Sequence, residues 1–217
     1  MAIITISRGT KSGGRAVAEC LAKGLGYPCV AREVLQEAAE ALGASEAKVR
    51  EKLTTPPGPW DVITRERHAY VVAVQSALAS RCVGGNLIYH GLAGQFLLRD
   101  LQGVLRVRLV APMPLRVQAI VGLHAHTTHE AAERFIRKLD RERRRWVRRM
   151  YGVDLTDTSL YELTINLESI ALETACLMIG TLARRPPYET TDAMLARIDE
   201  FATTSRRHLQ AIAGGGR

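Results

Sequence analysis

The sequence is poor in aromatic residues and has no long apolar run. Only 5% of its 217 residues are aromatic while 47% are hydrophobic, so aliphatic side chains must supply most of any core. No apolar run reaches the roughly 18–20 residues that a membrane-spanning helix needs. Residues 1–6 have neither a basic region nor a cleavage site, so we expect no signal peptide and read this stretch as a strand.

Cysteine is also scarce, and the four thiols are scattered. Cys20, Cys29, Cys82 and Cys176 form no C-x-x-C pair. This pattern is typical of reduced thiols in a cytosolic protein and argues against a disulfide framework or a zinc site. We therefore predict a cytoplasmic protein with no membrane partner. The length is sufficient for one buried domain, alone or with a helical appendage.

Acidic residues are almost absent from one basic segment. The net charge is +8, and residues 134–149 contain nine lysines and arginines against two acids, a local excess of +7. On a helix, five of these cations fall on one stripe at spacings of three or four residues: Arg134, Lys138, Arg141, Arg145 and Arg148. Clustered cations repel one another unless an anion lies among them, so the stripe predicts an anionic partner.

Two interpretations of this helix stay open. In a small kinase such a helix is a lid that closes over phosphates, because arginines stabilise the charge of a transferred phosphoryl group. The other interpretation is a solvated basic face or a nucleic-acid contact, which interleaved aromatics would favour. Toward the end of the helix, Trp146 and Tyr151 are the nearest aromatic candidates, and Trp146 falls on the apolar face. A capping box predicts that the helix begins after an N-cap at Thr127, with Glu130 at its third position.

The periodicity predicts short strands that alternate with helices. The strands are expected at residues 3–7, 86–90, 104–110 and 161–166. Such alternation indicates a parallel sheet with helices on both faces, in which ligands bind at the carboxyl ends of the strands. We predict an α/β, three-layer αβα fold with a parallel sheet over residues 1–183. A helical lid is expected at about 124–152 and a C-terminal helical extension at 184–217.

A glycine-rich loop follows the first predicted strand. Against the pattern G-x-x-x-x-G-K-[ST], Gly9 and Gly14 hold the glycine positions, Arg15 replaces the lysine and Ala16 replaces the hydroxyl residue. A strand that enters a helix through such a loop directs free backbone N–H groups at an anion. We predict that the nucleotide phosphates bind at Gly9, Lys11, Ser12, Gly13, Gly14 and Arg15. The alternative is a glycine-rich turn without a ligand.

These features resemble the cytidylate-kinase-like family of P-loop proteins over roughly residues 1–183. The resemblance is carried by Ile6-Ser7-Arg8, Ser12-Gly13-Gly14-Arg15, Arg32-Glu33-Val34-Leu35, residues 96–100, residues 104–112, Asp140-Arg141 and residues 161–166. It implies an ATP-dependent transfer of phosphate to a nucleoside monophosphate, with CMP as one candidate, or to a related small acceptor. It also implies ATP and Mg²⁺ as cofactors and nucleotide substrates as partners. The magnesium ligands are not assigned.

A kinase is the first hypothesis, and it gives each candidate residue a role. The catalytic residues on the transferred phosphate would be Arg15, Arg141, Arg145 and Arg149. The acceptor would be bound by Arg32, His90, Gly91 and Gln95. For His90, which ends a predicted strand, a buried structural histidine is the alternative.

A non-catalytic nucleotide-binding regulatory module with the kinase fold is the second hypothesis. Three departures favour it: Ala16 in the loop, no arginine in residues 89–95 where cytidylate kinases have a Gly-Arg-Asp motif, and no Walker B aspartate in residues 104–110. The family usually has glycine at the place of Lys11 and aspartate at that of Ala31. Nucleic-acid binding through the arginine-rich helix ranks third, so nucleic acid is not an expected partner. A homodimer is compatible with the sequence.

Overall fold

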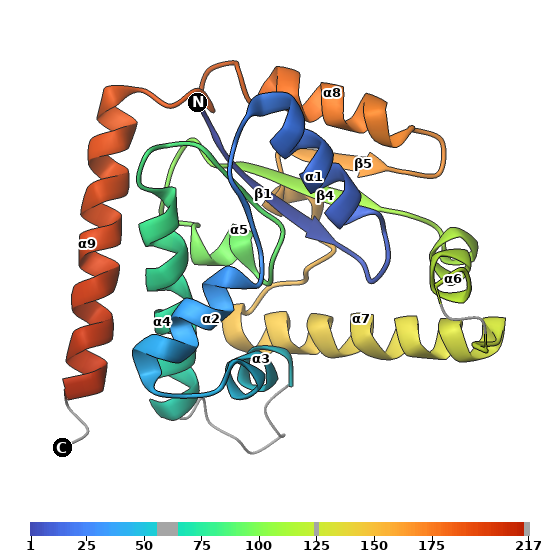
Figure 1. Cartoon of the computed structure of the whole chain (residues 1–217), viewed down its shortest axis with the longest axis horizontal. Helices are drawn as coiled ribbons and strands as arrows, with labels where there is room; N and C mark the ends of the chain where they lie inside the picture. The colour runs from blue at the N-terminus through green and yellow to red at the C-terminus, as the bar shows by residue number, and fades with distance from the viewer. Residues whose placement is uncertain (56–64, 124–125, 215–217) are drawn as a thin grey trace.

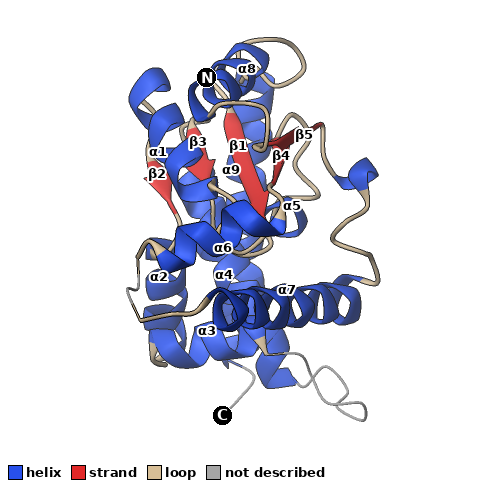
Figure 2. Cartoon of the chain, turned by 90° about the vertical axis from the view of Figure 1, so that its right-hand side faces the viewer, coloured by secondary structure: helices blue, strands red, loops and turns tan. Residues whose placement is uncertain are grey.

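The computed structural model describes residues 1–55, 65–123 and 126–214, and its centre is a five-stranded parallel sheet (Figures 1 and 2). The strand order is β2-β3-β1-β4-β5. The strands are β1 (Ile3–Arg8), β2 (Cys29–Val30), β3 (Leu87–Tyr89), β4 (Leu105–Val110) and β5 (Leu163–Asn166). Since β1 pairs with both β3 and β4, the loop that follows β1 leaves from the middle of the sheet.

Helices cover both faces of the sheet and form the outer layers. They are α1 (Gly14–Leu25), α2 (Glu33–Leu42), α3 (Glu46–Thr54), α4 (Arg65–Cys82), α5 (Gly94–Leu97), α6 (Met113–Val121), α7 (His129–Tyr151), α8 (Leu172–Leu182) and α9 (Asp192–Gly214), with a short 3-10 helix, η1 (Thr158–Leu160). The chain therefore has the predicted P-loop αβα fold. None of the helices in the described ranges is long and apolar enough to cross a lipid bilayer.

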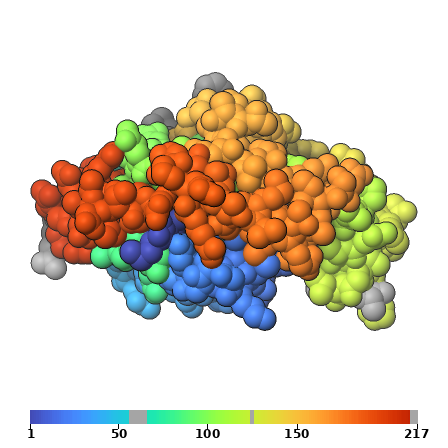
Figure 3. All heavy atoms as spheres, turned by 90° about the horizontal axis from the view of Figure 1, so that it is seen from above, coloured from blue at the N-terminus to red at the C-terminus, as the bar shows by residue number. Residues whose placement is uncertain are grey.

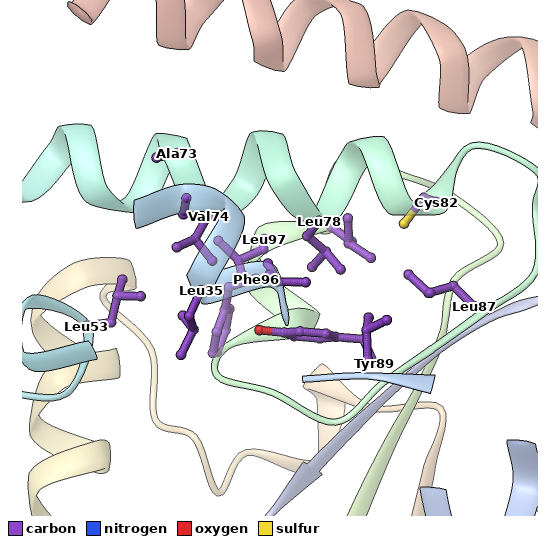
Figure 4. Close-up of a cluster of buried hydrophobic side chains, with 14 of the residues drawn as sticks. Leu35, Leu53, Ala73, Val74, Leu78, Cys82, Leu87, Tyr89, Phe96 and Leu97 are labelled. Atoms are coloured by element: carbon purple, nitrogen blue, oxygen red, sulfur yellow. The ribbon is translucent and has the colours of Figure 1, made fainter. Parts of the chain in front are cut away.

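Each face of the sheet has its own apolar core. On one face, Val17 and Leu21 of α1 and Ile179 of α8 pack against Ile4 and Ile6 of β1. On the other face, side chains of α2, α4 and α5 pack against β3, as Figure 4 shows around Tyr89. The alternation of Ile3, Ile4 and Ile6 between the two clusters follows from the two-residue period of a strand.

The last helix packs against the core and forms one end of the molecule (Figures 1 and 3). Helix α9 lies along α4, and its Ile198 and Ala202 are buried. The segment before α9 is fixed by Thr190, whose N–H donates to the carbonyl of Met1 at 2.6 Å and whose hydroxyl donates to the carbonyl of Gly85 at 2.7 Å. The predicted C-terminal helix is therefore present and is packed against the domain.

The arginine-rich helix begins one residue later than its capping box predicts. The N-cap is Thr128, whose hydroxyl oxygen accepts the N–H of Ala131 at 3.2 Å, so the prediction of Thr127 was wrong by one position. Thr128 has the extended backbone that an N-cap requires, with φ −73° and ψ 157°. The helix ends at a left-handed Gly152, the last residue of the segment predicted to be a lid. Residues 124 and 125 of that lid lie outside the described residues.

Candidate active site

The loop between β1 and α1 exposes the amino end of α1. Gly13 and Lys11 have left-handed backbones, with φ of 76° and 60°, and they turn the chain into the helix. The first helical hydrogen bond runs from the N–H of Val17 to the carbonyl of Gly13 at 3.1 Å. The N–H groups that precede Val17 in the first turn therefore have no partner within the helix. Free N–H groups at the amino end of a helix can bind an anion, as the sequence predicts for this loop.

Arg8 lies across the start of α1. A methyl group on Gly14 would overlap the Arg8 side chain, so glycine at this position makes room for the arginine. The Arg8 Nε is buried without a hydrogen-bond partner, and burial lowers the pKa of the guanidinium. A buried cation without partners is unfavourable unless an anion joins it. Arg8 is therefore positioned to pair with an anionic ligand.

A carboxylate on α7 ties this helix to the loop. Asp140 accepts the N–H of Thr10 at 2.9 Å and its hydroxyl at 2.8 Å, and it also forms an ion pair with Arg116 of α6. Arg116 donates from Nε to the carbonyl of Thr10 at 2.7 Å. Burial by itself raises the pKa of Asp140, but the hydrogen bonds from Arg116 and Thr10 outweigh it and hold the pKa below its usual value. The carboxylate is therefore ionised, and it fixes α6 and α7 against the loop.

One turn further along α7, Arg143 reaches the same loop. Its Nη1 donates to the carbonyl of Arg8 at 3.1 Å and lies 3.5 Å from Oδ1 of Asp140. Burial is the main cause that lowers the pKa of Arg143, and the charge of Arg8 is the next. Two largely buried guanidinium groups therefore repel each other, with a single carboxylate, that of Asp140, near them.

The first cavity lies between the loop, the end of β4 and α7, with a volume of about 280 Å³. Gly9 and Ser12 of the loop line it, and the Ser12 hydroxyl is buried without a partner. Among the described residues, its wall contains one carboxylate, that of Asp140, against five guanidinium groups: Arg8, Arg108, Arg116, Arg143 and Arg144. This excess of positive charge in a confined space favours a polyanion.

The second cavity lies between the end of β3 and helices α2 and α3, with a volume of about 390 Å³. Arg32 lines it and donates from Nε to both oxygens of Glu46, at 2.9 and 2.7 Å. The Nδ1 of His90 is buried there without a partner. Burial lowers the pKa of His90, and the charges of Arg8 and Arg15 lower it further, so the imidazole is neutral at pH 7.

The two cavities share two side chains. Arg8 and Arg143 line both of them, so a ligand in either cavity would lie beside these guanidinium groups. The shared wall is formed by the end of β1 and by α7, which contact each other through the hydrogen bond from Arg143 to the carbonyl of Arg8.

The structure brings together many of the residues that the sequence predicts for the site. Gly9 and Ser12 line the first cavity. The second cavity contains the whole predicted acceptor set: Arg32, His90, Gly91 and Gln95. The amide of Gln95 donates to the hydroxyl of Tyr161 at 3.3 Å, which links α5 to the loop before β5.

Other predicted residues point elsewhere. Arg15 has a side chain that is 79% exposed and pairs with Glu19 at 2.7 Å, and Lys11 lines neither cavity. On α7, three arginines are exposed and line neither cavity: Arg141, Arg145 and Arg149. The face of α7 that meets the loop presents Asp140 and Arg143 in their place.

Sequence reasoning missed the arginines that surround the first cavity. Arg8, Arg108 and Arg116 come from a strand end, a strand and a helix, with no common spacing that would mark them as a set. Arg143 did have a signal: it lies three residues before Trp146, which the sequence places on the apolar face and which is only 2% exposed. A cation on the buried face of an amphipathic helix is a better site candidate than one on its exposed face.

The described residues supply few ligands for a metal ion. No group of three histidine, cysteine, aspartate or glutamate side chains within these ranges could hold one. Asp140 is already engaged by Arg116 and Thr10, and Ala16 has no hydroxyl. The unpartnered Ser12 hydroxyl is the oxygen of the loop that fits a phosphate-bound magnesium ion. The arginines of the first cavity would fit a polyphosphate, and Ser12 would offer a metal ion one protein ligand.

Comparison with known proteins identifies the family. A model of the cytidylate kinase-like family matches residues 3–169. The chain belongs to the cytidylate kinase-like family. Among curated proteins, it is similar to a cytidylate kinase of Desulfurococcus amylolyticus, with 35% identity over 79 residues. That alignment spans 36% of this chain and 42% of the length of the relative.

A solved structure shares the fold of this cytidylate kinase-like chain. An uncharacterized protein from Eubacterium ventriosum has a TM-score of 0.64 at 16% identity, covering 84% of this chain and 98% of the other. A shikimate kinase from Acinetobacter baumannii, solved in complex with shikimate, has a TM-score of 0.49 at 20% identity, covering 84% and 92%.

Proposed function

We propose that this chain transfers a phosphoryl group from ATP to a nucleoside monophosphate, with CMP as one candidate, or to a related small acceptor. The observation that carries the proposal is that two cavities, one beside the phosphate loop and one beside α2 and α3, meet at Arg8 and Arg143. A kinase needs such a layout, because donor and acceptor must approach from opposite sides of the transferred group.

The donor phosphates are assigned to the loop and the first cavity. The free amides at the start of α1 bind the phosphate oxygens, and the arginines of the cavity wall neutralise their charge. ATP supplies the phosphoryl group, and Mg²⁺ supplies further charge neutralisation at its oxygens. The chain's own contribution to the metal would be the Ser12 hydroxyl, which has no other partner.

The transferred phosphoryl group is assigned to the space between Arg8 and Arg143. Negative charge spreads over its equatorial oxygens in the transition state, and guanidinium groups fixed in advance stabilise that charge. Arg143 is fixed by its hydrogen bond to the carbonyl of Arg8 and by Asp140. Helix α7 covers the site and excludes water, which would otherwise screen the arginines and hydrolyse the donor.

The acceptor is assigned to the second cavity. Arg32 and Arg50 of its wall both pair with Glu46, at 2.7 and 2.6 Å, so they form a cationic pair around one carboxylate. A phosphate monoester carries enough charge to bind both. The neutral His90 offers its free Nδ1 to a base or sugar of the acceptor.

A non-catalytic nucleotide-binding module remains the second candidate. The specific observation in its favour is that the one carboxylate of the first cavity is already bound by Arg116 and Thr10. No described acid of that cavity is then free to bind a metal ion or to accept a proton.

A coupled phosphoryl-transfer assay with ATP and a panel of nucleoside monophosphates tests the proposal, with calorimetry of ATP binding beside it. We expect turnover with at least one acceptor. If turnover is lost in Arg15→Ala, the exposed Arg15 side chain would have to contact the phosphates during the reaction. Binding of ATP without turnover on any acceptor would favour the regulatory module. Absence of both ATP binding and turnover would remove both candidates.

A further inference from the structure

The outer face of α7 carries a row of cations that the proposed active site does not use. We call this set the outer stripe: Arg134, Lys138, Arg141, Arg145 and Arg148. All five are exposed, whereas Ile136, Trp146 and Val147 on the opposite side of the helix are buried. Over 14 residue steps the stripe is about 21 Å long. In Figure 1 the helix lies along the lower edge of the molecule.

The middle of the outer stripe is not neutralised by the described part of the chain. Other cations of α7 have acidic partners: Arg137 pairs with Glu133, and both Arg144 and Arg148 lie 3.7 Å from Asp154. For Lys138, Arg141 and Arg145, no ion pair or hydrogen bond occurs with any described residue. Three neighbouring cations on one helix face repel one another, so the stripe is electrostatically unfavourable without an external anion.

An exposed aromatic ring stands beside the stripe. Phe135 is 49% exposed and lies three residues before Lys138 on the same helix. The aromatics that the sequence suggested for such a role are unsuitable, because Trp146 is buried and Tyr151 stacks on Phe96 at 4.6 Å between ring centres. Phe135 is therefore the ring of this helix that can meet an external partner.

We infer that the outer stripe and Phe135 bind a single-stranded nucleic acid. A row of cations matches the regularly repeated charge of a phosphodiester backbone, and arginine donates to phosphate through two parallel N–H groups. An unpaired base can stack on the ring of Phe135. In a duplex the bases are stacked on one another, so a base would first have to leave that stack. This surface is separate from both cavities, so the inference goes beyond the proposed kinase activity.

Charge and shape disfavour two other partners. A membrane-surface helix buries an apolar face in the lipid, but the apolar face of α7 is covered by the protein itself. A single small anion would use one or two cations in a recess, whereas the outer stripe extends along an exposed helix. An acidic protein shares the charge of a nucleic acid but lacks bases that stack, and the experiment separates these two.

The test is fluorescence anisotropy with a labelled oligonucleotide of about 12 nucleotides at several salt concentrations. The triple charge reversal Lys138→Glu, Arg141→Glu, Arg145→Glu should weaken binding at least tenfold. It should also reduce the slope of log affinity against log salt by about 2, since about 0.7 counterions are released per neutralised phosphate. Phe135→Ser should weaken binding by about tenfold and leave the salt slope unchanged, because stacking is not an ionic contact.

A matched control separates the stripe from the total charge. The triple reversal Lys23→Glu, Arg184→Glu, Arg207→Glu changes the net charge equally at exposed positions on other segments, and its binding should stay within about twofold of wild type. Circular dichroism and thermal melting confirm that each variant folds. Three outcomes would overturn the inference: no binding by the wild type near physiological salt, an equal loss in the control triple, or equal affinity for polyglutamate or anionic vesicles.

Discussion

The two faces of α7 carry the same kind of side chain in opposite physical settings. On the inner face, Arg143 is largely buried, bonded to the carbonyl of Arg8 and held near Asp140. On the outer face, Arg141 and Arg145 are exposed and meet no described acid. The side chain of Arg143 is therefore largely removed from water and is held in one orientation by its hydrogen bond. The side chains of Arg141 and Arg145 stay hydrated and keep their rotational freedom.

The difference decides what each face can do. A charge that is already desolvated and oriented stabilises a transition state without reorganisation, which is the requirement for catalysis. A charge in water is screened within about 8–10 Å and serves attraction of a polyanion rather than chemistry. One helix can therefore supply a catalytic face and a binding face, and the following measurements test that division.

The largest expected effect is that of Arg143→Met on phosphoryl transfer. Loss of a fixed cation at the transferred phosphate should lower kcat/KM by about 10³-fold. The matched variant Arg145→Met makes the same substitution two positions further along α7, on the outer face. It should lower kcat/KM by less than about tenfold. Steady-state kinetics of both variants give the ratio, with Arg137→Met as the control because Arg137 belongs to neither cavity nor the outer stripe. Equal losses in Arg143→Met and Arg145→Met would end the distinction between the faces.

Removal of the Asp140 carboxylate should have the next largest effect, now on stability. Asp140→Ala leaves Arg116 without its ion-pair partner and frees two hydrogen-bond donors of Thr10. We expect the free energy of unfolding to fall by about 3 kcal/mol, since it leaves a buried cation unpaired. Urea denaturation measures it. Glu133→Ala on the exposed side of the same helix removes a surface ion pair and should change the value by less than about 1 kcal/mol.

The same carboxylate should leave a signature in the acid range. The pKa of Asp140 is lower in the folded chain than in the unfolded one, so its contribution to stability is complete above about pH 4 and disappears as the pH falls through the folded value. Stability measured from pH 6 downward should thus fall more steeply in wild type than in Asp140→Asn. Parallel curves for the two proteins would show that the carboxylate is not held by these contacts.

The smallest expected effect is a change in the titration of His90. Burial lowers its pKa first, and the charge of Arg8 on the inner wall lowers it further. Arg8→Met should therefore raise the pKa of His90, as NMR of the imidazole resonances would show. Arg145→Met on the outer face should leave it in place. Because the folded pKa is depressed, His90 also contributes stability that is complete above about pH 6.5 and is lost as the pH falls toward the folded value.

Local signals account for the parts of this structure that the sequence predicted well. The strand, the glycine loop and α1 occupy consecutive residues, so periodicity and turn chemistry identify them without knowledge of the rest. His90, Gly91 and Gln95, which line the second cavity, follow a predicted strand, and the carboxyl ends of parallel strands meet at one edge of the sheet.

The arginine cluster could not be predicted in the same way. Asp140 and Thr10 are 130 positions apart, and Arg116 reaches Thr10 across 106. No short-range pattern encodes such pairings, which depend on how α6 and α7 pack against the loop. The periodicity of α7 did separate two faces, but charge density drew attention to the outer one. The useful signal was Arg143, which lies three residues before the buried Trp146.

Because the two cavities share part of their wall, the binding of a ligand in one cavity should affect the binding of a ligand in the other. Two ligands that draw on the same pair of cations, Arg8 and Arg143, are thermodynamically coupled. The factor by which a donor changes the dissociation constant of an acceptor must then equal the factor by which the acceptor changes that of the donor. Because both ligands are anions competing for one pool of positive charge, this reciprocal cooperativity should be negative in the ground state.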